Sequence, residues 1–308
     1  MTSREIRIFL LVAVLFILAA LLPVADSGYW LSIGVTIATY MVLSTSWALF
    51  SGPTHYISLA TGAFYGIGMF IVGGGIDLLP YWVLVVIAGV VGAILAALIG
   101  LATLRLSGVY FVIFTLGLAE FVRQIVTWIQ TTMGSSSGLY VLTDLNDTII
   151  YWELLILGAF VYLAGWWINR SRLGFALRII GNDEVVAVHS GINTAYSKVI
   201  LFIFSGTIAT IVGALLAPRL SYIESNIAFS PMLSFIVVIT ALLGGAQKLW
   251  GPIVGVIPFM LAWDFLTATF PNQTTLMLGI CFLLVVYLIP NGFAGLIEKY
   301  LPLRHQER

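Results

Sequence analysis

The feature that most constrains this chain is a series of ten long, continuous apolar segments. A membrane-spanning helix needs roughly 20 apolar residues, because the bilayer core is about 30 Å thick and a helix rises about 1.5 Å per residue. Strands of a membrane barrel would instead alternate polar and apolar residues. The segments therefore predict helices, at 6–25, 29–50, 55–74, 80–104, 108–130, 149–168, 197–217, 231–247, 250–270 and 275–290.

Composition agrees with this fold class. Hydrophobic residues make up 61% of the chain and charged residues only 8%, against roughly 25% charged residues in an average soluble domain. We expect an all-α polytopic membrane protein, a single transmembrane domain over residues 1–308 with about ten transmembrane or re-entrant helices. The segments 51–75 and 231–250 could equally be re-entrant or broken helices.

The basic residues predict which helix ends face the cytoplasm. With the N-terminus inside, eleven of the 13 basic residues fall at or beside cytoplasmic loops, as the positive-inside rule expects. Of the other two, Arg219 falls outside and Arg123 lies within a span. Both termini are then predicted to be cytoplasmic. The eleven residues are Arg4, Arg7, Arg105, Arg170, Arg172, Arg178, Lys198, Lys248, Lys299, Arg304 and Arg308.

The motifs of several enzyme classes are missing from the sequence. It contains no phosphate-binding loop, no H-E-x-x-H and no G-x-S-x-G, and its three histidines are widely scattered. We therefore expect no enzyme activity in this chain, no cofactor and no metal site. The net charge of zero gives no reason to expect a nucleic-acid partner. A pore-forming subunit driven by a separate motor, an ion-gradient-driven secondary transporter, and an intramembrane enzyme or structural protein stay open.

Few ionisable residues fall inside the predicted spans. Glu120 and Arg123 are three residues apart, so they can pair on one helix face. Asp264 lies in the ninth span, where it is either hydrogen-bonded to a neighbouring helix or placed on a translocation path. A carrier driven by an ion gradient would need such groups to bind its coupling ion.

Glycine and proline interrupt the apolar run "SGPTHYISLATGAFYGIGMFIVGGG" at 51–75. Irregular backbone at membrane depth is tolerated where protein or a water-filled path surrounds it. The segment is therefore a candidate for the translocation path, with close helix packing as the alternative. The candidate path residues are Ser58, Thr61, Gly62, Phe64 and Gly66, together with Glu120 and Asp264.

The most polar stretch, "SRLGFALRIIGNDEVVAVHSGI" at 171–192, predicts a folded loop of two short helices. The first places Leu177 at helical spacing from other apolar residues, with Arg178 off that face. Asn182 is expected to cap the second helix, which Gly191 would follow. The loop either lies on lipid headgroups or docks to a protein partner, and acidic residues such as Glu184 favour the partner.

The run "GFALRIIGNDEVVAVHSGINTAYSKVILFIFSG" (174–206) resembles the cytoplasmic coupling segment of the permease subunits of branched-chain amino acid ABC importers, the LivM type. Its pattern is matched at Gly174, Leu177, Ile180, Asn182, Asp183, Ala187, Gly191, Ile192 and Lys198, while Ile179 departs from it. "ISLATGAFYGIG" (57–68) is similar to a second family block, with departures at Ala60 and Gly62. "RLSGVYFVIFTLGLAE", "GSSSGL", "LGGAQKLWGPIVG" and "IPNGFAGLI" resemble further blocks in the expected order. The resemblance covers roughly residues 45–298.

The resemblance implies a permease subunit of the inner membrane that does not itself bind ATP. Its expected partners are a second, related permease, two cytoplasmic ATP-binding subunits and an extracytoplasmic substrate-binding protein. The cytoplasmic coupling loop, residues 169–196, would fit a groove on an ATP-binding subunit, and its expected coupling residues are Gly174, Leu177, Arg178, Asn182, Asp183, Glu184, Ala187 and Gly191. A hydrophobic amino acid, branched-chain first, is the expected substrate. Urea or a short amide is the alternative, and an ion-gradient-driven transporter is the alternative from another class.

Overall fold

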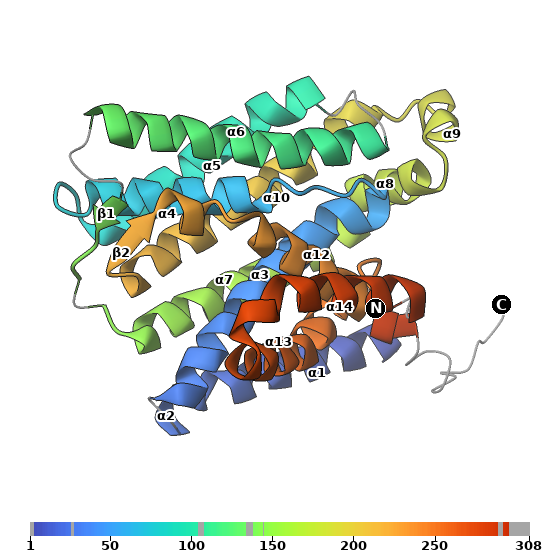
Figure 1. Ribbon diagram of the computed structural model, residues 1–308. Coiled ribbons are helices and arrows are strands. Elements are labelled where there is room, and N and C mark those ends of the chain that lie inside the picture. Colours follow the sequence, from blue (N-terminus) through green and yellow to red (C-terminus); the bar gives the residue numbers. More distant parts are fainter. Residues whose placement is uncertain are drawn as a thin grey trace.

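The computed structural model describes residues 3–25, 28–103, 108–133, 138–143, 145–288 and 292–295, and 84% of them are helical (Figure 1). The helices are α1 (Ser3–Ala20), α2 (Leu22–Ala25), α3 (Tyr29–Thr54), α4 (Thr61–Gly75), α5 (Tyr81–Thr103), α6 (Val109–Met133), α7 (Asp147–Arg170), α8 (Arg172–Asn182), α9 (Glu184–His189), α10 (Thr194–Leu216), α11 (Ser225–Ala228), α12 (Pro231–Gly244), α13 (Gly251–Thr269) and α14 (Thr274–Leu288). There are also two 3-10 turns, η1 (Ala217–Arg219) and η2 (Pro271–Gln273), and a helical turn at residues 292–295.

Seven helices among the described residues are long and apolar enough to cross a membrane. The predicted all-α membrane class is therefore confirmed, whereas the expectation of about ten spans stays a prediction. Helix α4 has only 15 residues. The placement of the C-terminus in the cytoplasm concerns residues 296–308, which lie outside the described part of the chain.

The expected break in 51–75 falls between α3 and α4, over a linker that we define as residues 55–60. Helix α3 ends at Thr54, and the left-handed backbone of the C-cap residue His55 (φ 58°) stops the helical ladder. Side chains satisfy the irregular backbone that follows. Trp47 Nε1 donates to the Ser58 carbonyl at 2.7 Å, and Thr115 Oγ1 accepts from the Leu59 N–H at 3.1 Å. Such compensation is what permits non-helical backbone at membrane depth.

The core centres on α10, which packs against α4 and α5. Small residues allow this close approach. A Cβ at Gly68 would lie 1.9 Å from the Thr210 carbonyl oxygen, and one at Gly92 would lie 2.4 Å from Thr210 Oγ1. Both glycines therefore serve close helix packing.

A two-stranded antiparallel ribbon was not predicted from the sequence. Strand β1 (Gly138–Tyr140) pairs with β2 (Tyr222–Glu224), and Leu139 lies opposite Ile223. Residues 134–137, just before β1, lie outside the described part of the chain. The ribbon lies at one end of the helix bundle and the α8–α9 loop at the other (Figure 1).

Candidate functional site

The α8–α9 loop is a folded unit, as the sequence predicts. Helix α8 begins after Ser171, whose hydroxyl accepts from the Gly174 N–H at 3.4 Å. Leu177 is buried against the bundle and Arg178 is exposed, which confirms the amphipathic pattern. The Arg178 guanidinium donates to the Asn169 carbonyl at 2.9 Å, at the end of α7. Helix α8 packs against α3, α7 and α10.

Helix α9 is capped at both ends. The prediction that Asn182 caps it was wrong by one residue, because Asn182 ends α8 and Asp183 is the cap. The Asp183 carboxylate accepts from the N–H groups of Val185 and Val186, at 2.8 and 3.2 Å. Beyond the helix, Gly191 has a left-handed backbone (φ 76°), as expected. The Gly191 N–H donates to the Val188 carbonyl, which closes the C-terminal turn.

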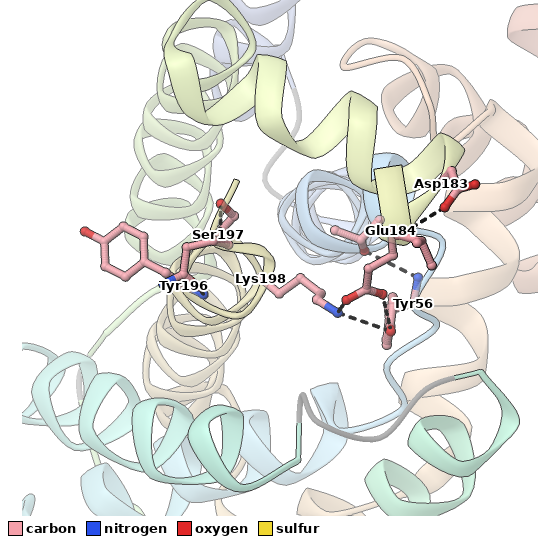
Figure 2. A network of polar contacts seen from close by, with 9 residues as sticks. Tyr56, Asp183, Glu184, Tyr196, Ser197 and Lys198 are labelled. Carbon is pink, nitrogen blue, oxygen red and sulfur yellow. Dashed lines mark hydrogen bonds and ion pairs between the residues drawn. The ribbon is translucent and has the colours of Figure 1, made fainter. Parts of the chain in front are cut away.

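Glu184 points inward and forms an ion pair with a buried lysine (Figure 2). Its Oε1 lies 2.6 Å from Lys198 Nζ, and its Oε2 accepts from the Tyr56 hydroxyl at 3.0 Å. The Lys198 side chain is 2% exposed and that of Glu184 39% exposed. Burial alone would raise the pKa of the Glu184 carboxyl. The hydrogen bonds from Lys198 and Tyr56 and the lysine charge outweigh it, so this pKa lies below its ordinary value of 4.5.

The loop also touches the α3–α4 linker at a second point. His55 Nδ1 lies 2.9 Å from the Gly181 carbonyl oxygen, within hydrogen-bonding distance. The two backbone segments are so close here that a Cβ at Gly181 would lie 2.0 Å from the Pro53 carbonyl oxygen. The loop is therefore fixed to the linker through both His55 and Tyr56.

The exposed surface of the loop includes a group of apolar side chains among polar ones. Four side chains on α8 and α9 are between 51% and 66% exposed, and we call them the apolar patch: Phe175, Val185, Val186 and Val188. Sequence reasoning singled out the acidic residues here and missed this patch. The sequence feature that could have revealed the patch is the V-V-A-V run at 185–188, in which only Ala187 is buried. Clusters of apolar side chains that are exposed to water often mark sites of contact with another protein.

Three candidate path residues lie together at the start of α4. Ser58, Thr61 and Phe64 line a small cavity of about 10 Å³ with residues of α10. The ring of Phe64 packs edge-on against that of Phe202, with centroids 5.8 Å apart. Gly62 donates its N–H to Ser234 Oγ at 2.8 Å.

Gly66 serves packing. A Cβ at Gly66 would lie 2.3 Å from the ring of Phe229, so a larger residue there would displace that ring. The glycine therefore allows α4 to approach the segment that follows α11.

Glu120 and Asp264 lie on different helices. Arg123 pairs with Glu120, as the spacing predicts, and also donates to the Asn226 side chain on α11. Asp264 on α13 accepts from the Tyr29 hydroxyl of α3 at 2.5 Å. Within the described ranges, no three metal-ligating side chains gather in a group that could hold an ion.

The comparisons with known proteins agree with this architecture. Residues 29–287 match the family described as "Branched-chain amino acid transport system / permease component". The chain belongs to this family of ABC importer permeases. It is a multi-pass protein of the inner membrane. Permeases of this family work with ATP-binding and substrate-binding partners.

Two relatives show how far the similarity extends. The chain is 25% identical to the high-affinity branched-chain amino acid transport system permease protein LivM of Escherichia coli K12, over 96% of this chain and 77% of LivM. It is 28% identical to the ribose import permease protein RbsC of the same strain, over 32% of each chain. No solved structure matches this chain.

Proposed function

We propose that this chain is the permease subunit of an ABC importer for hydrophobic amino acids, with branched-chain amino acids as the preferred substrates. The family match and the LivM similarity support the class, and LivM's name supports the substrate. ATP hydrolysis would take place on two separate cytoplasmic subunits, and an extracytoplasmic binding protein would deliver the substrate. A second, related permease would complete the membrane part.

The observation that carries this proposal is the construction of the α8–α9 loop. Both of its helices are capped, and it presents the apolar patch away from the bundle. Several basic residues lie near it, among them Arg170 and Arg178, which favours a cytoplasmic position. A pair of capped helices that exposes apolar side chains suits a groove on a soluble subunit better than a flexible tether would. We infer that ATP-driven movement of that subunit is applied here.

The carboxylates in the described spans favour a motor-driven importer over an ion-gradient carrier. Glu120 accepts from Arg123 and Gln124, Glu153 accepts from Tyr81, and Asp264 accepts from Tyr29. Glu120 and Asp264 are bonded to protein groups, whereas a coupling-ion site needs groups available to the ion; Glu153 keeps one buried oxygen, Oε1, without a hydrogen bond.

We place part of the translocation path along the exposed face of α6. Only 17% of its most apolar stretch is buried, the lowest value among the seven membrane-length helices. Glu120 is 48% exposed near the middle of this helix, and a Cβ at Gly117, one turn away, would meet no atom within 4 Å. A half-exposed carboxylate at this depth is costly in lipid, so water or a second permease is expected to cover it.

Uptake into proteoliposomes tests the proposal. With all four kinds of subunit present, tritiated leucine uptake should require ATP and the ATP-binding subunits and should resist ionophores. Excess unlabelled isoleucine should compete, and urea should not. Uptake that collapses with an ionophore and proceeds without ATP would instead identify a gradient-driven carrier, and competition by urea would identify the amide substrate class.

A further inference from the structure

Lys198 is a buried cation that lies beneath the surface proposed to bind an ATP-binding subunit. Its side chain is 2% exposed, at the start of α10. The ammonium lies 2.6 Å from Glu184 of α9 and 3.2 Å from the Tyr56 hydroxyl of the linker. It also lies 4.3 Å from the centre of the Tyr56 ring, a cation–π contact. One ammonium group thus joins three segments of the chain (Figure 2).

These contacts hold the segments to one another. If the Lys198 ammonium moved away from Glu184 and Tyr56, it would lose their electrostatic stabilisation, and burial would keep water from replacing it. Separating the three side chains therefore costs much free energy. The His55–Gly181 contact adds a second connection between loop and linker, at the neighbouring residue. A displacement of α9 is therefore passed to Tyr56 instead of being absorbed by a flexible joint.

The linker beyond Tyr56 is held by exchangeable side-chain hydrogen bonds. Ser58 O accepts from Trp47 of α3, Leu59 N–H donates to Thr115 of α6, and Leu59 O accepts from Ser234 of α12. Three helices therefore depend on the position of two linker residues. A shift of Tyr56 would act on all three bonds and on the cavity lined by Ser58 and Thr61.

We propose that Lys198 is a positioning residue that fastens α9 to the α3–α4 linker and so delivers movement of the coupling loop to the segment Ser58–Thr61. The Tyr56 hydroxyl is the contact through which the linker is moved. This inference rests on the proposed function, because it assigns a path to the movement that an ATP-binding subunit would apply at the α8–α9 loop.

The test uses the complete transporter in proteoliposomes and measures tritiated leucine imported per ATP hydrolysed. Tyr56→Phe removes the hydroxyl and keeps the ring over Lys198. The hydroxyl donates to Glu184 and accepts from Lys198, and the loss of one net hydrogen bond changes an equilibrium about fivefold. We therefore expect the ratio to fall at least about fivefold, while the ATP-binding subunit still co-purifies. Tyr196→Phe is the matched control, since Tyr196 is 63% exposed and its ring points away from the network (Figure 2).

Conservative variants separate positioning from folding. Lys198→Met should lower the ratio as Tyr56→Phe does, and Lys198→Arg, which keeps the charge, should restore much of it. An unchanged ratio in Tyr56→Phe would overturn the inference. This includes the case in which ATP hydrolysis and uptake both fall in the same proportion. A wild-type transporter that imports leucine without ATP would instead overturn the proposed function, so the two failures are distinguishable.

Discussion

Lys198 and Glu184, 14 residues apart in the chain, form an ion pair of 2.6 Å in which the two partners differ in burial. The lysine side chain is 2% exposed, while the glutamate side chain is 39% exposed. The pair is therefore asymmetric: if the lysine is removed the glutamate can recover water, but if the glutamate charge is removed the lysine cannot. This asymmetry gives the first stability prediction.

Glu184→Gln should destabilise the protein more than Lys198→Met. The first substitution leaves a buried ammonium without a counter-charge, at a cost of about 1–3 kcal/mol. The second leaves a carboxylate that solvent can screen, and it should cost below about 1 kcal/mol. Denaturant titration of the purified subunit measures both, and the double variant should resemble Lys198→Met. Equal losses in the two single variants would contradict the asymmetry.

The same pair predicts a pH dependence. The folded-state pKa of Glu184 lies below its ordinary value of 4.5, so the carboxylate binds fewer protons in the folded than in the unfolded chain. Its contribution to stability is therefore fully present above about pH 4.5 and is lost as the pH falls through the lowered folded-state pKa. The protection factors of the α9 amides, which divide out the pH dependence of intrinsic exchange, should fall in that window when they are followed from pH 6 downward. Glu184→Gln should remove this dependence.

Local patterns predicted much of the candidate site. The spacing of Leu177 and Ile180 located the buried face of α8, and Gly191 located the end of α9. The cap was misplaced because Asn182 and Asp183 both favour that position, and a single sequence does not decide between neighbours. Only the structure shows that Asp183 accepts from the first N–H groups of α9.

Contacts between distant segments could not be read from the sequence. Tyr56 and Glu184 are 128 residues apart, and nothing in either local pattern pairs them. The β1–β2 ribbon joins residues near 139 and 223 for the same reason. Arg219, the one loop residue against the positive-inside rule, lies 3.4 Å from Asp147, so an ion pair offsets its charge. Long-range packing supplies each of these relationships.

The apolar patch predicts where an ATP-binding subunit attaches. Val188→Asp should reduce co-purification of that subunit about tenfold or more, because a carboxylate would be buried in the interface without a partner. The fold should persist, since Val188 is 54% exposed. Val188→Thr is the near-isosteric control and should lose far less. Undiminished co-purification of the aspartate variant would place the contact elsewhere.

Charge reversal at Asp183 and Glu184 is a poor test of docking. Asp183→Lys would remove the α9 cap, which costs about 1 kcal/mol of helix stability. Glu184→Lys would place a second ammonium beside Lys198. Both changes should unfold α9 before any partner is involved. Faster amide exchange in α9 of the isolated subunit would establish this, and unchanged exchange would refute it.

The Tyr29–Asp264 hydrogen bond separates the two interpretations of Asp264. If the residue is structural, Tyr29→Phe and Asp264→Asn should each cost about 0.6–1.7 kcal/mol, the range for hydrogen bonds between membrane helices. Their effects should not add, because both remove the same contact. Leucine uptake per folded transporter should stay unchanged. A selective loss of uptake in Asp264→Asn would place this carboxylate on the path.

The exposed face of α6 gives the sharpest test of the translocation path. Cys281 is the only cysteine, so Cys281→Ser provides a thiol-free background. In it, Glu120→Cys should react with a charged, water-soluble thiol reagent about tenfold or more faster than Phe121→Cys, because only a hydrated thiol ionises readily. Phe121 is the matched control, as a neighbouring residue that is 61% exposed but apolar. Substrate and ATP should change the rate at position 120 alone. Equal and slow labelling at both positions would mean that lipid covers this face, and Glu120 would then belong to an ion pair with Arg123 that serves only stability.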